Sequence, residues 1–69
     1  MKLFNQIWTE MSPLQKNELA TRMGSSYRAL GHVASGERNV APKRVPKLIE
    51  ALKAMKIRAN KHSIRPDLW

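Results

Sequence analysis

Gly24 separates two short stretches in which apolar residues recur at helical spacing, and this division constrains the fold more than any other feature. The first stretch opens with Ser12-Pro13-Leu14-Gln15, which carries a helix-capping serine, a proline at the first helical position and a glutamine that completes a capping box. In the second stretch, Ser26 can cap a helix and Gly36 can end it, since glycine adopts the left-handed conformation at little cost. The pattern predicts helices over residues 13–23 and 27–35, joined by a turn of three residues.

The rest of the chain also favours helices. One is predicted near the N-terminus by the apolar residues Leu3, Phe4, Ile7, Trp8 and Met11. Another is predicted over residues 43–55 by the stripe Val45, Leu48, Ile49 and Leu52. Pro46 must lie in the first turn of that helix or mark its true start, because a proline further inside would break it. In the tail, residues 57–69, either Asn60 caps a short helix through Ile64 or residues 57–59 form a strand. We therefore expect an all-α fold with four to five helices.

A chain of 69 residues is expected to form one domain, residues 1–69, because a second hydrophobic core could not be filled. It has no cysteine, which excludes disulfides and thiolate metal sites and fits a reducing cytoplasm. No apolar run approaches the roughly 20 residues needed to cross a bilayer. Polar residues at positions 5, 6 and 10 interrupt the N-terminal segment, so it is not a signal peptide. We expect a soluble protein with no membrane partner.

Positive charge is concentrated in the last two thirds of the chain. Two of the 13 lysines and arginines lie within residues 1–21, where two glutamates balance them. The other eleven are accompanied by three acidic residues, so the whole net charge of +8 lies within residues 22–69. A field of one sign over most of a small domain indicates a polyanionic partner, nucleic acid in the first place and anionic lipid as the alternative.

Residues 15–35 suit a helix-turn-helix, the pair of short helices that places its second helix in the major groove of DNA. Ala20 is small where the two helices cross closely, and Gly24 allows the turn four residues later. Four apolar residues supply the contacts that hold the helices against each other and the core: Leu19, Met23, Leu30 and Val33. Because these six restricted positions agree, the segment predicts a helix-turn-helix.

The outward face of the second helix carries Arg28, His32 and Ser35, with Tyr27 at its leading edge. These four residues are the candidates for base contacts, and Arg28 is the first of them because its fork matches two acceptors of guanine. Gly31 would let the helix approach DNA closely, which explains a residue that costs a helix about 1 kcal/mol. The alternatives are that Arg28 contacts only phosphate, that Tyr27 contacts phosphate or packs partly on the core, and that His32 is a solvated surface residue.

Contacts to the DNA backbone are expected on both sides of this helix, since most protein–DNA hydrogen bonds go to phosphate and sugar. The candidates are Arg22, Ser25, Ser26, Arg38, Asn39, Lys43 and Arg44. Two alternatives remain open. One is that Ser26 serves only as a helix cap. The other is that the basic side chains form only a solvated surface and contact no DNA.

The chain resembles a known family in two places. The run Glu18-Leu19-Ala20-Thr21-Arg22-Met23-Gly24-Ser25-Ser26, followed by Leu30, Val33 and Ala34-Ser35-Gly36-Glu37-Arg38, resembles the helix-turn-helix of the phage repressor and Cro superfamily. The ending His62-Ser63-Ile64-Arg65-Pro66-Asp67-Leu68-Trp69 resembles that of the YdaS-like, Cro-type regulators of bacterial prophages. The resemblance runs from about residue 12 to the end. It departs from the family at Lys56-Ile57, where relatives often carry Gly-Gly, and at residues 27–29.

The resemblance implies a compact lambda-repressor/Cro-like domain that acts as a transcriptional repressor. Such a protein binds palindromic operator DNA as a homodimer, in the cytoplasm of a bacterial host and associated with its nucleoid. Some members of the family are antitoxin-like, so the alternative is a protein-interaction module that binds a toxin and autoregulates its operon. The apolar tail residues Ile64, Leu68 and Trp69 are candidates for the dimer interface, or else they pack on the core of their own chain.

Little in the sequence favours an enzyme. The two histidines, His32 and His62, lie on separate elements, and the five acidic residues are scattered. The three glycines match no phosphate-binding loop. We expect no catalytic residue, no cofactor and no metal site.

Overall fold

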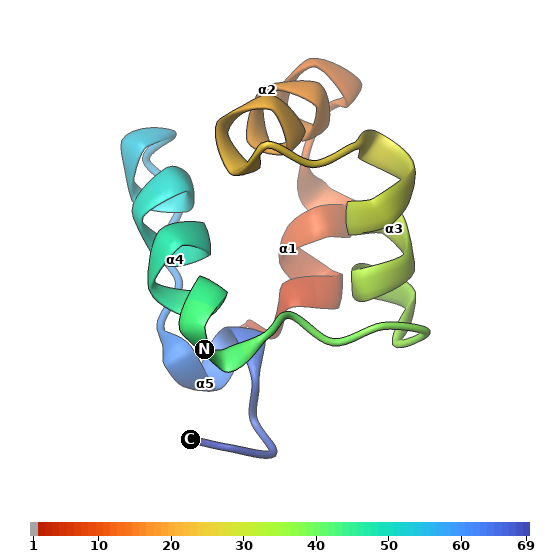
Figure 1. Ribbon diagram of the computed structural model, residues 1–69. Helices are drawn as coiled ribbons and strands as arrows, with labels where there is room; N and C mark the ends of the chain where they lie inside the picture. The colour runs from red at the N-terminus through yellow and green to blue at the C-terminus, as the bar shows by residue number, and fades with distance from the viewer. Residues whose placement is uncertain (1) are drawn as a thin grey trace.

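Five α-helices and one 3-10 turn form the regular structure of residues 2–69, the part of the chain that the computed structural model describes (Figure 1). The elements follow one another as α1 (Phe4–Glu10), α2 (Pro13–Met23), α3 (Tyr27–Ser35), η1 (Pro42–Arg44), α4 (Val45–Ala54) and α5 (Lys61–Ile64). No strand occurs within these residues. The expected all-α fold is therefore confirmed. Within the same residues, no helix has both the length and the apolar character needed to span a membrane.

The helices α2 and α3 begin and end at the predicted residues. Ser12 Oγ accepts a hydrogen bond from Gln15 N at 3.2 Å, and Gln15 Oε1 accepts one from Ser12 N at 2.9 Å. Ser26 Oγ accepts one from the backbone N–H of Ala29 at 3.0 Å and so caps α3. Gly24 and Gly36 end the two helices in the left-handed conformation, with φ of 65° and 90°. These caps depend only on residues within one helical turn of each other.

The fourth helix starts later than predicted. Residues 42–44 form the 3-10 turn η1, in which the N–H of Arg44 donates to the carbonyl of Ala41 at 2.8 Å, and α4 begins at Val45. Pro46 has no N–H to donate to the carbonyl of Pro42, so an α-helix cannot run through this segment. The predicted start at residue 43 is wrong by two residues for this reason, whereas Pro46 lies in the first turn as expected.

The tail forms the short helix and not the strand. Asn60 Oδ1 accepts a hydrogen bond from Ser63 N at 2.9 Å and caps α5, while residues 57–59 belong to neither a helix nor a strand. Lys56 lies two residues after the end of α4 and adopts a left-handed conformation with φ of 62°. A left-handed position of this kind favours glycine. Lys56 is also the first of the two residues, Lys56-Ile57, at which the family that the chain resembles often carries Gly-Gly.

One hydrophobic core joins all five helices. Helix α1 packs against α3, α2 packs against both α3 and α4, and α5 packs against α4. The most deeply buried apolar side chains are Leu19, Val45, Leu48 and Leu52. Leu30 is the buried residue of α3, and Val33 and Ala34 pack beside it. The face of α3 opposite these residues is therefore left outside the core.

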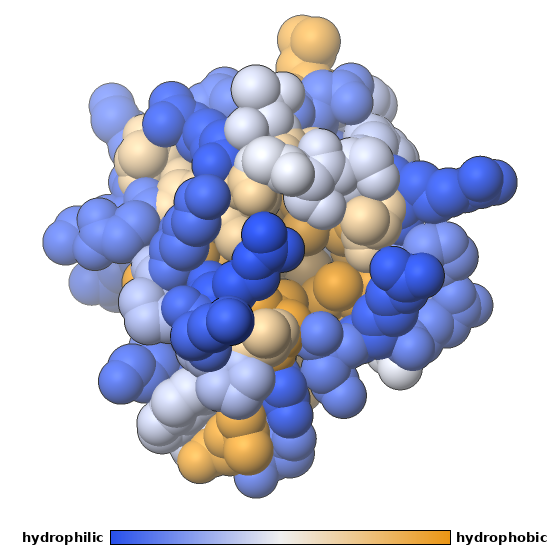
Figure 2. All heavy atoms as spheres, viewed as in Figure 1, coloured by the Kyte–Doolittle hydropathy of each residue, from blue (hydrophilic) through white to orange (hydrophobic). Residues whose placement is uncertain are grey.

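Hydrophilic side chains cover most of the face shown in Figure 2, with apolar groups between α4 and α1. Two apolar residues of the tail stay outside the core, since Leu68 and Trp69 are 46% and 44% exposed. Ile64 is buried in the core of its own chain, which is the second of the two placements expected for it. Leu14, on the first turn of α2, is 82% exposed and makes no core contact.

Candidate nucleic-acid interface

The outward face of α3 carries the residues that the sequence singled out for base contacts. Leu30 is 4% exposed and holds one side of the helix in the core. Tyr27, Arg28 and Ser35 are exposed, and His32 is half-buried. The division of this nine-residue helix into a buried side and an outward side therefore follows its apolar pattern. Arg28 forms no ion pair within residues 2–69, so its guanidinium is available to a ligand.

Gly31 lies on α3 without any internal contact that would require a glycine. A Cβ atom added at this position would meet nothing within 4 Å, and its φ lies outside the left-handed region. A glycine inside a helix lowers helix stability by about 1 kcal/mol relative to alanine. Neither the backbone conformation nor the packing within the chain therefore requires a glycine at this position.

Tyr27 is partly a packing residue. Its ring lies edge-on to Trp8 of α1, with the ring centroids 5.4 Å apart, and it remains 41% exposed. The Lys16 ammonium lies 5.3 Å from the centroid of Trp8 and 5.8 Å from that of Tyr27. This stack fixes the first turn of α3 against α1 and α2. The alternative that Tyr27 packs partly on the core is thus the observed one, with the rest of its ring open to solvent.

Four of the seven residues predicted to contact the DNA backbone lie around one hollow of about 260 Å³: Ser25, Arg38, Asn39 and Arg44. They come from the turn between α2 and α3, from the loop after α3 and from η1, so the fold brings three segments of the chain together. Two guanidinium groups, one hydroxyl and one amide are hydrogen-bond donors that suit a phosphate group. The floor is apolar and includes Leu30 and Val33 of α3.

The other three predicted backbone residues lie elsewhere. The hydroxyl of Ser26 is used as the cap of α3. The Nε of Arg22 donates to a carboxylate oxygen of Glu18, one turn earlier on α2, at 2.9 Å. Lys43 is exposed on η1 and does not line the hollow. Both Ser26 and Arg22 therefore have internal partners that a DNA contact would have to share or replace.

Arg65, which pairs with Asp67 in the tail, also joins the tail to the loop beside the hollow. Arg65 donates from Nε and Nη2 to the two carboxylate oxygens of Asp67, at 2.9 and 2.7 Å, and from Nη1 to the carbonyl of Val40 at 2.8 Å. The hydrogen bonds from Arg65 hold the pKa of Asp67 below its ordinary value, and the same bonds raise the pKa of Arg65. Val40 follows Arg38 and Asn39 in the chain, so this fork fixes the loop that carries them.

Four further residues at this surface were not predicted to have a role there: Lys16, Glu18, Glu37 and Arg65. The pair of Glu18 and Arg22 has the i, i+4 spacing of helical ion pairs, so the sequence contained a signal for it. His32 Nδ1 is hydrogen-bonded to the carboxylate of Glu37, across the end of α3, and no regular spacing indicates such a contact. The contacts of Lys16 with Trp8 and Tyr27, and of Arg65 with Val40, join different segments of the chain and had no sequence signal.

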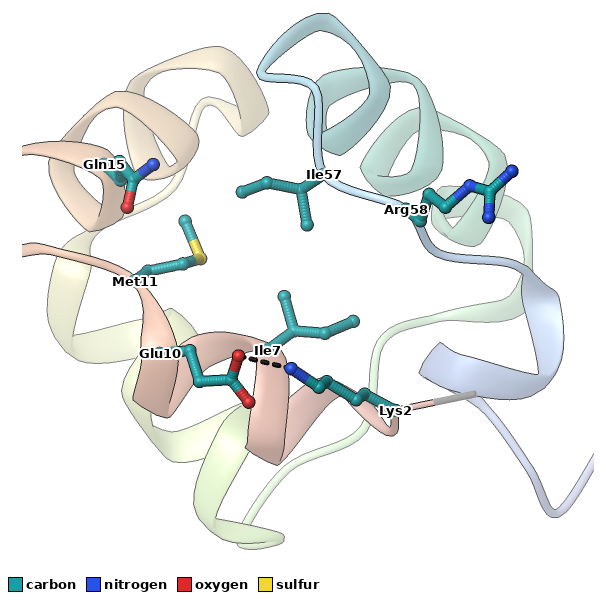
Figure 3. Close-up of a pocket in the computed structure, with 7 residues that line it drawn as sticks. All are labelled: Lys2, Ile7, Glu10, Met11, Gln15, Ile57 and Arg58. Carbon is teal, nitrogen blue, oxygen red and sulfur yellow. Dashed lines mark hydrogen bonds and ion pairs between the residues drawn. The ribbon is translucent and has the colours of Figure 1, made fainter.

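A separate cleft of about 480 Å³ lies between α1, the start of α2 and the segment after α4 (Figure 3). Its apolar side chains are Ile7, Met11 and Ile57, and at its edge Lys2 pairs with Glu10. None of the predicted DNA-contact residues lines it. Residues 2–69 hold no group of three or more histidine, cysteine, aspartate or glutamate side chains that could bind a metal ion.

Comparisons of the chain with protein-family models, with curated proteins and with solved structures found no match. The case for a function therefore depends on the residues and their arrangement.

Proposed function

We propose that the protein binds double-stranded DNA sequence-specifically, with α2 and α3 as a helix-turn-helix and α3 in the major groove. The observation that carries the proposal is the outward face of α3. It presents Arg28, His32 and Ser35 around the open position at Gly31, while the hollow of Ser25, Arg38, Asn39 and Arg44 lies on the side of α3 that carries Leu30 and Val33. The candidates for base and phosphate contacts thus lie on the same helix and on the segments that flank it, in a chain with a net charge of +8.

The two sets of residues have different tasks in this proposal. Arg28 reads guanine, because its fork matches the two acceptors on the major-groove edge of that base. The hollow receives a phosphate of the DNA backbone, which sets the position of α3 but carries no sequence information. The exposed part of Tyr27 lies at the leading edge of α3 and contacts the adjacent base or sugar. Ser35 is weaker as a base contact, because its hydroxyl already donates to the carbonyl of His32 at 3.0 Å.

We further propose that the protein is a transcriptional repressor of the Cro type that binds a palindromic operator as a homodimer in the bacterial cytoplasm. The resemblance of residues 18–38 and 62–69 to the prophage regulators supports this proposal. The exposed Leu68 and Trp69 are the remaining tail candidates for the contact between the two copies. Sedimentation of the free protein and of its DNA complex tests the stoichiometry, and one protein per duplex would exclude the dimer.

Competition binding tests the proposal as a whole. The labelled duplex is the DNA that flanks the gene of this protein, the competitor is a scrambled duplex of the same length and composition, and the titration is repeated at two salt concentrations. A regulator should bind its site roughly 10³-fold or more tightly than the scrambled duplex, with affinity falling steeply as salt rises. Equal competition by the scrambled duplex at moderate salt would exclude the proposal and favour the antitoxin-like alternative.

A further inference from the structure

Glu37 is the only acidic residue between positions 19 and 49, and it lies where the proposed function calls for positive charge. It follows Gly36 at the end of α3, with a side chain that is 64% exposed. A carboxylate at the edge of a DNA-binding face repels phosphate, so its presence there needs a reason. The structure points to one, because its carboxylate is hydrogen-bonded to Nδ1 of His32, a candidate for a base contact.

The backbone places Glu37 beside His32 independently of the side-chain contact. Gly36 takes φ of 90° and turns the chain back at the end of α3. The N–H of Glu37 then donates to the carbonyl of His32 at 3.0 Å. The two residues are therefore joined through both main chain and side chain. The main-chain bond keeps Glu37 next to His32, and the side-chain bond orients the imidazole ring, with 41% of the histidine side chain exposed.

The chemistry of the pair determines where the ring carries its hydrogen. An ionised carboxylate only accepts hydrogen bonds, so Nδ1 of the imidazole must be the donor. In the uncharged ring the other nitrogen, Nε2, is then a bare acceptor. In the major groove an acceptor pairs with an exocyclic amino group, which adenine presents at N6 and cytosine at N4. Guanine and thymine present only acceptors at the corresponding edge.

We propose that Glu37 is a positioning residue that sets the base specificity of His32. By holding the hydrogen on Nδ1, it makes Nε2 an acceptor that selects adenine or cytosine at one position of the operator. This inference rests on the proposed function and goes beyond it. It states which bases His32 selects and explains why the acidic Glu37 lies beside it. Without Glu37, either nitrogen can carry the hydrogen, and the ring no longer distinguishes amino groups from carbonyl acceptors.

The first test needs no DNA. Nitrogen NMR shifts of the His32 ring, measured at about pH 8 where histidine side chains are ordinarily uncharged, report which nitrogen carries the hydrogen. The wild-type protein should show the Nδ1–H form, and Glu37→Ala should lose its predominance. Glu50→Gln on α4 also removes an exposed negative charge and should leave the shifts unchanged. An Nε2–H ring in the wild-type protein, or identical shifts in Glu37→Ala, would overturn the inference.

The second test measures base preference. The wild-type protein first selects its preferred duplex from a random-sequence library. The probes are that duplex and its variants, in which each position carries each of the four base pairs in turn. The wild-type protein should favour adenine or cytosine at the His32 position by about fivefold or more. Both His32→Ala and Glu37→Ala should abolish this preference and leave the one at the Arg28 position intact. Glu37→Gln should weaken it, since an amide can either donate to or accept from Nδ1.

The double variant separates positioning from charge. If Glu37 acts through the ring, Glu37→Ala should have no further effect on base preference in a protein that already carries His32→Ala. An unchanged base profile in Glu37→Ala, or equal changes on every duplex with and without His32, would overturn the inference while leaving the proposed function standing. The proposed function itself fails if the wild-type protein enriches no duplex at all.

Discussion

The guanidinium of Arg65 donates to the backbone carbonyl of Val40, 25 residues earlier in the chain, at 2.8 Å. The same guanidinium is held by the carboxylate of Asp67 through two hydrogen bonds. The tail therefore has a structural task, which is to hold the loop between α3 and η1. Since that loop carries Arg38 and Asn39, the order of the proposed phosphate site depends on the last residues of the chain.

Arg65→Ala should lower the midpoint of thermal unfolding and loosen the loop. The variant loses the contacts to Asp67 and Val40 together, and leaves the Val40 carbonyl without its partner. Hydrogen exchange should become faster at the amides of residues 38–41. Arg58→Ala removes an exposed arginine that forms no ion pair within residues 2–69 and serves as the control. Unchanged exchange in the loop would show that the fork is dispensable.

Stability should fall in acid in a way that depends on Asp67. Its pKa is lower in the folded chain than in the unfolded chain, because Arg65 donates to its ionised form. This contribution is complete above the ordinary carboxyl value of about 4 and is lost as the pH falls through the lowered folded value. Asp67→Asn should make the free energy of unfolding depend less on pH in this acidic range, as measured by denaturant unfolding at decreasing pH. Glu50→Gln is the matched control, and an equal loss of pH dependence there would contradict the assignment.

Gly31→Ala should separate stability from DNA binding. The new methyl group meets nothing within the chain and raises helix propensity, so the free energy of unfolding should increase by about 1 kcal/mol. The same methyl group would lie between α3 and the base pairs. We expect DNA binding to weaken by roughly 1–3 kcal/mol, the scale of one lost base-pair contact. Denaturant unfolding and DNA titration of the same variant check the two effects, and unweakened binding would remove Gly31 from the interface.

Arg28→Ala and Arg38→Ala should weaken DNA binding in different ways. Loss of Arg28 should cost about 1–3 kcal/mol on the preferred duplex and flatten the preference at one base position. Loss of Arg38 should weaken binding to all duplexes alike and reduce the slope of log affinity against log salt by about 1. Titration of each variant against substituted duplexes at several salt concentrations makes the comparison. If both variants lose affinity equally on every duplex, Arg28 contacts only phosphate.

Lys56→Gly should stabilise the protein without affecting DNA binding. Lys56 has φ of 62°, a conformation that costs a residue with a Cβ atom roughly 1–2 kcal/mol and costs glycine little. The greater freedom of glycine in the unfolded chain offsets part of this gain, so we expect a net increase of about 1 kcal/mol in denaturant unfolding. Lys53→Gly within α4 should instead be destabilising, and a loss of stability in both variants would contradict the strain at Lys56.

Local features of the fold could be predicted from the sequence with good accuracy. The bounds of α2 and α3 follow from Ser12, Gly24, Ser26 and Gly36, and the cap of α5 was one of two alternatives for the tail. The start of α4 was the clearest error, because a missing N–H at Pro46 acts four residues earlier in the chain. The division of α3 into a buried and an outward face followed from its apolar pattern. Its role in DNA binding stays a prediction.

The amino-acid sequence by itself determined the helices, their caps and the outward face of α3, since each depends on residues within about one turn of each other. Only the tertiary structure decided which side chains meet across the chain. The packing of α1 on α3 sets Tyr27 against Trp8, and the turn after α3 brings Glu37 to His32. The fold also gathers Ser25, Arg38, Asn39 and Arg44 around one hollow. Such contacts depend on how whole segments pack, which no local spacing encodes, and they decide how the hydrogen-bond donors and acceptors around α3 are arranged.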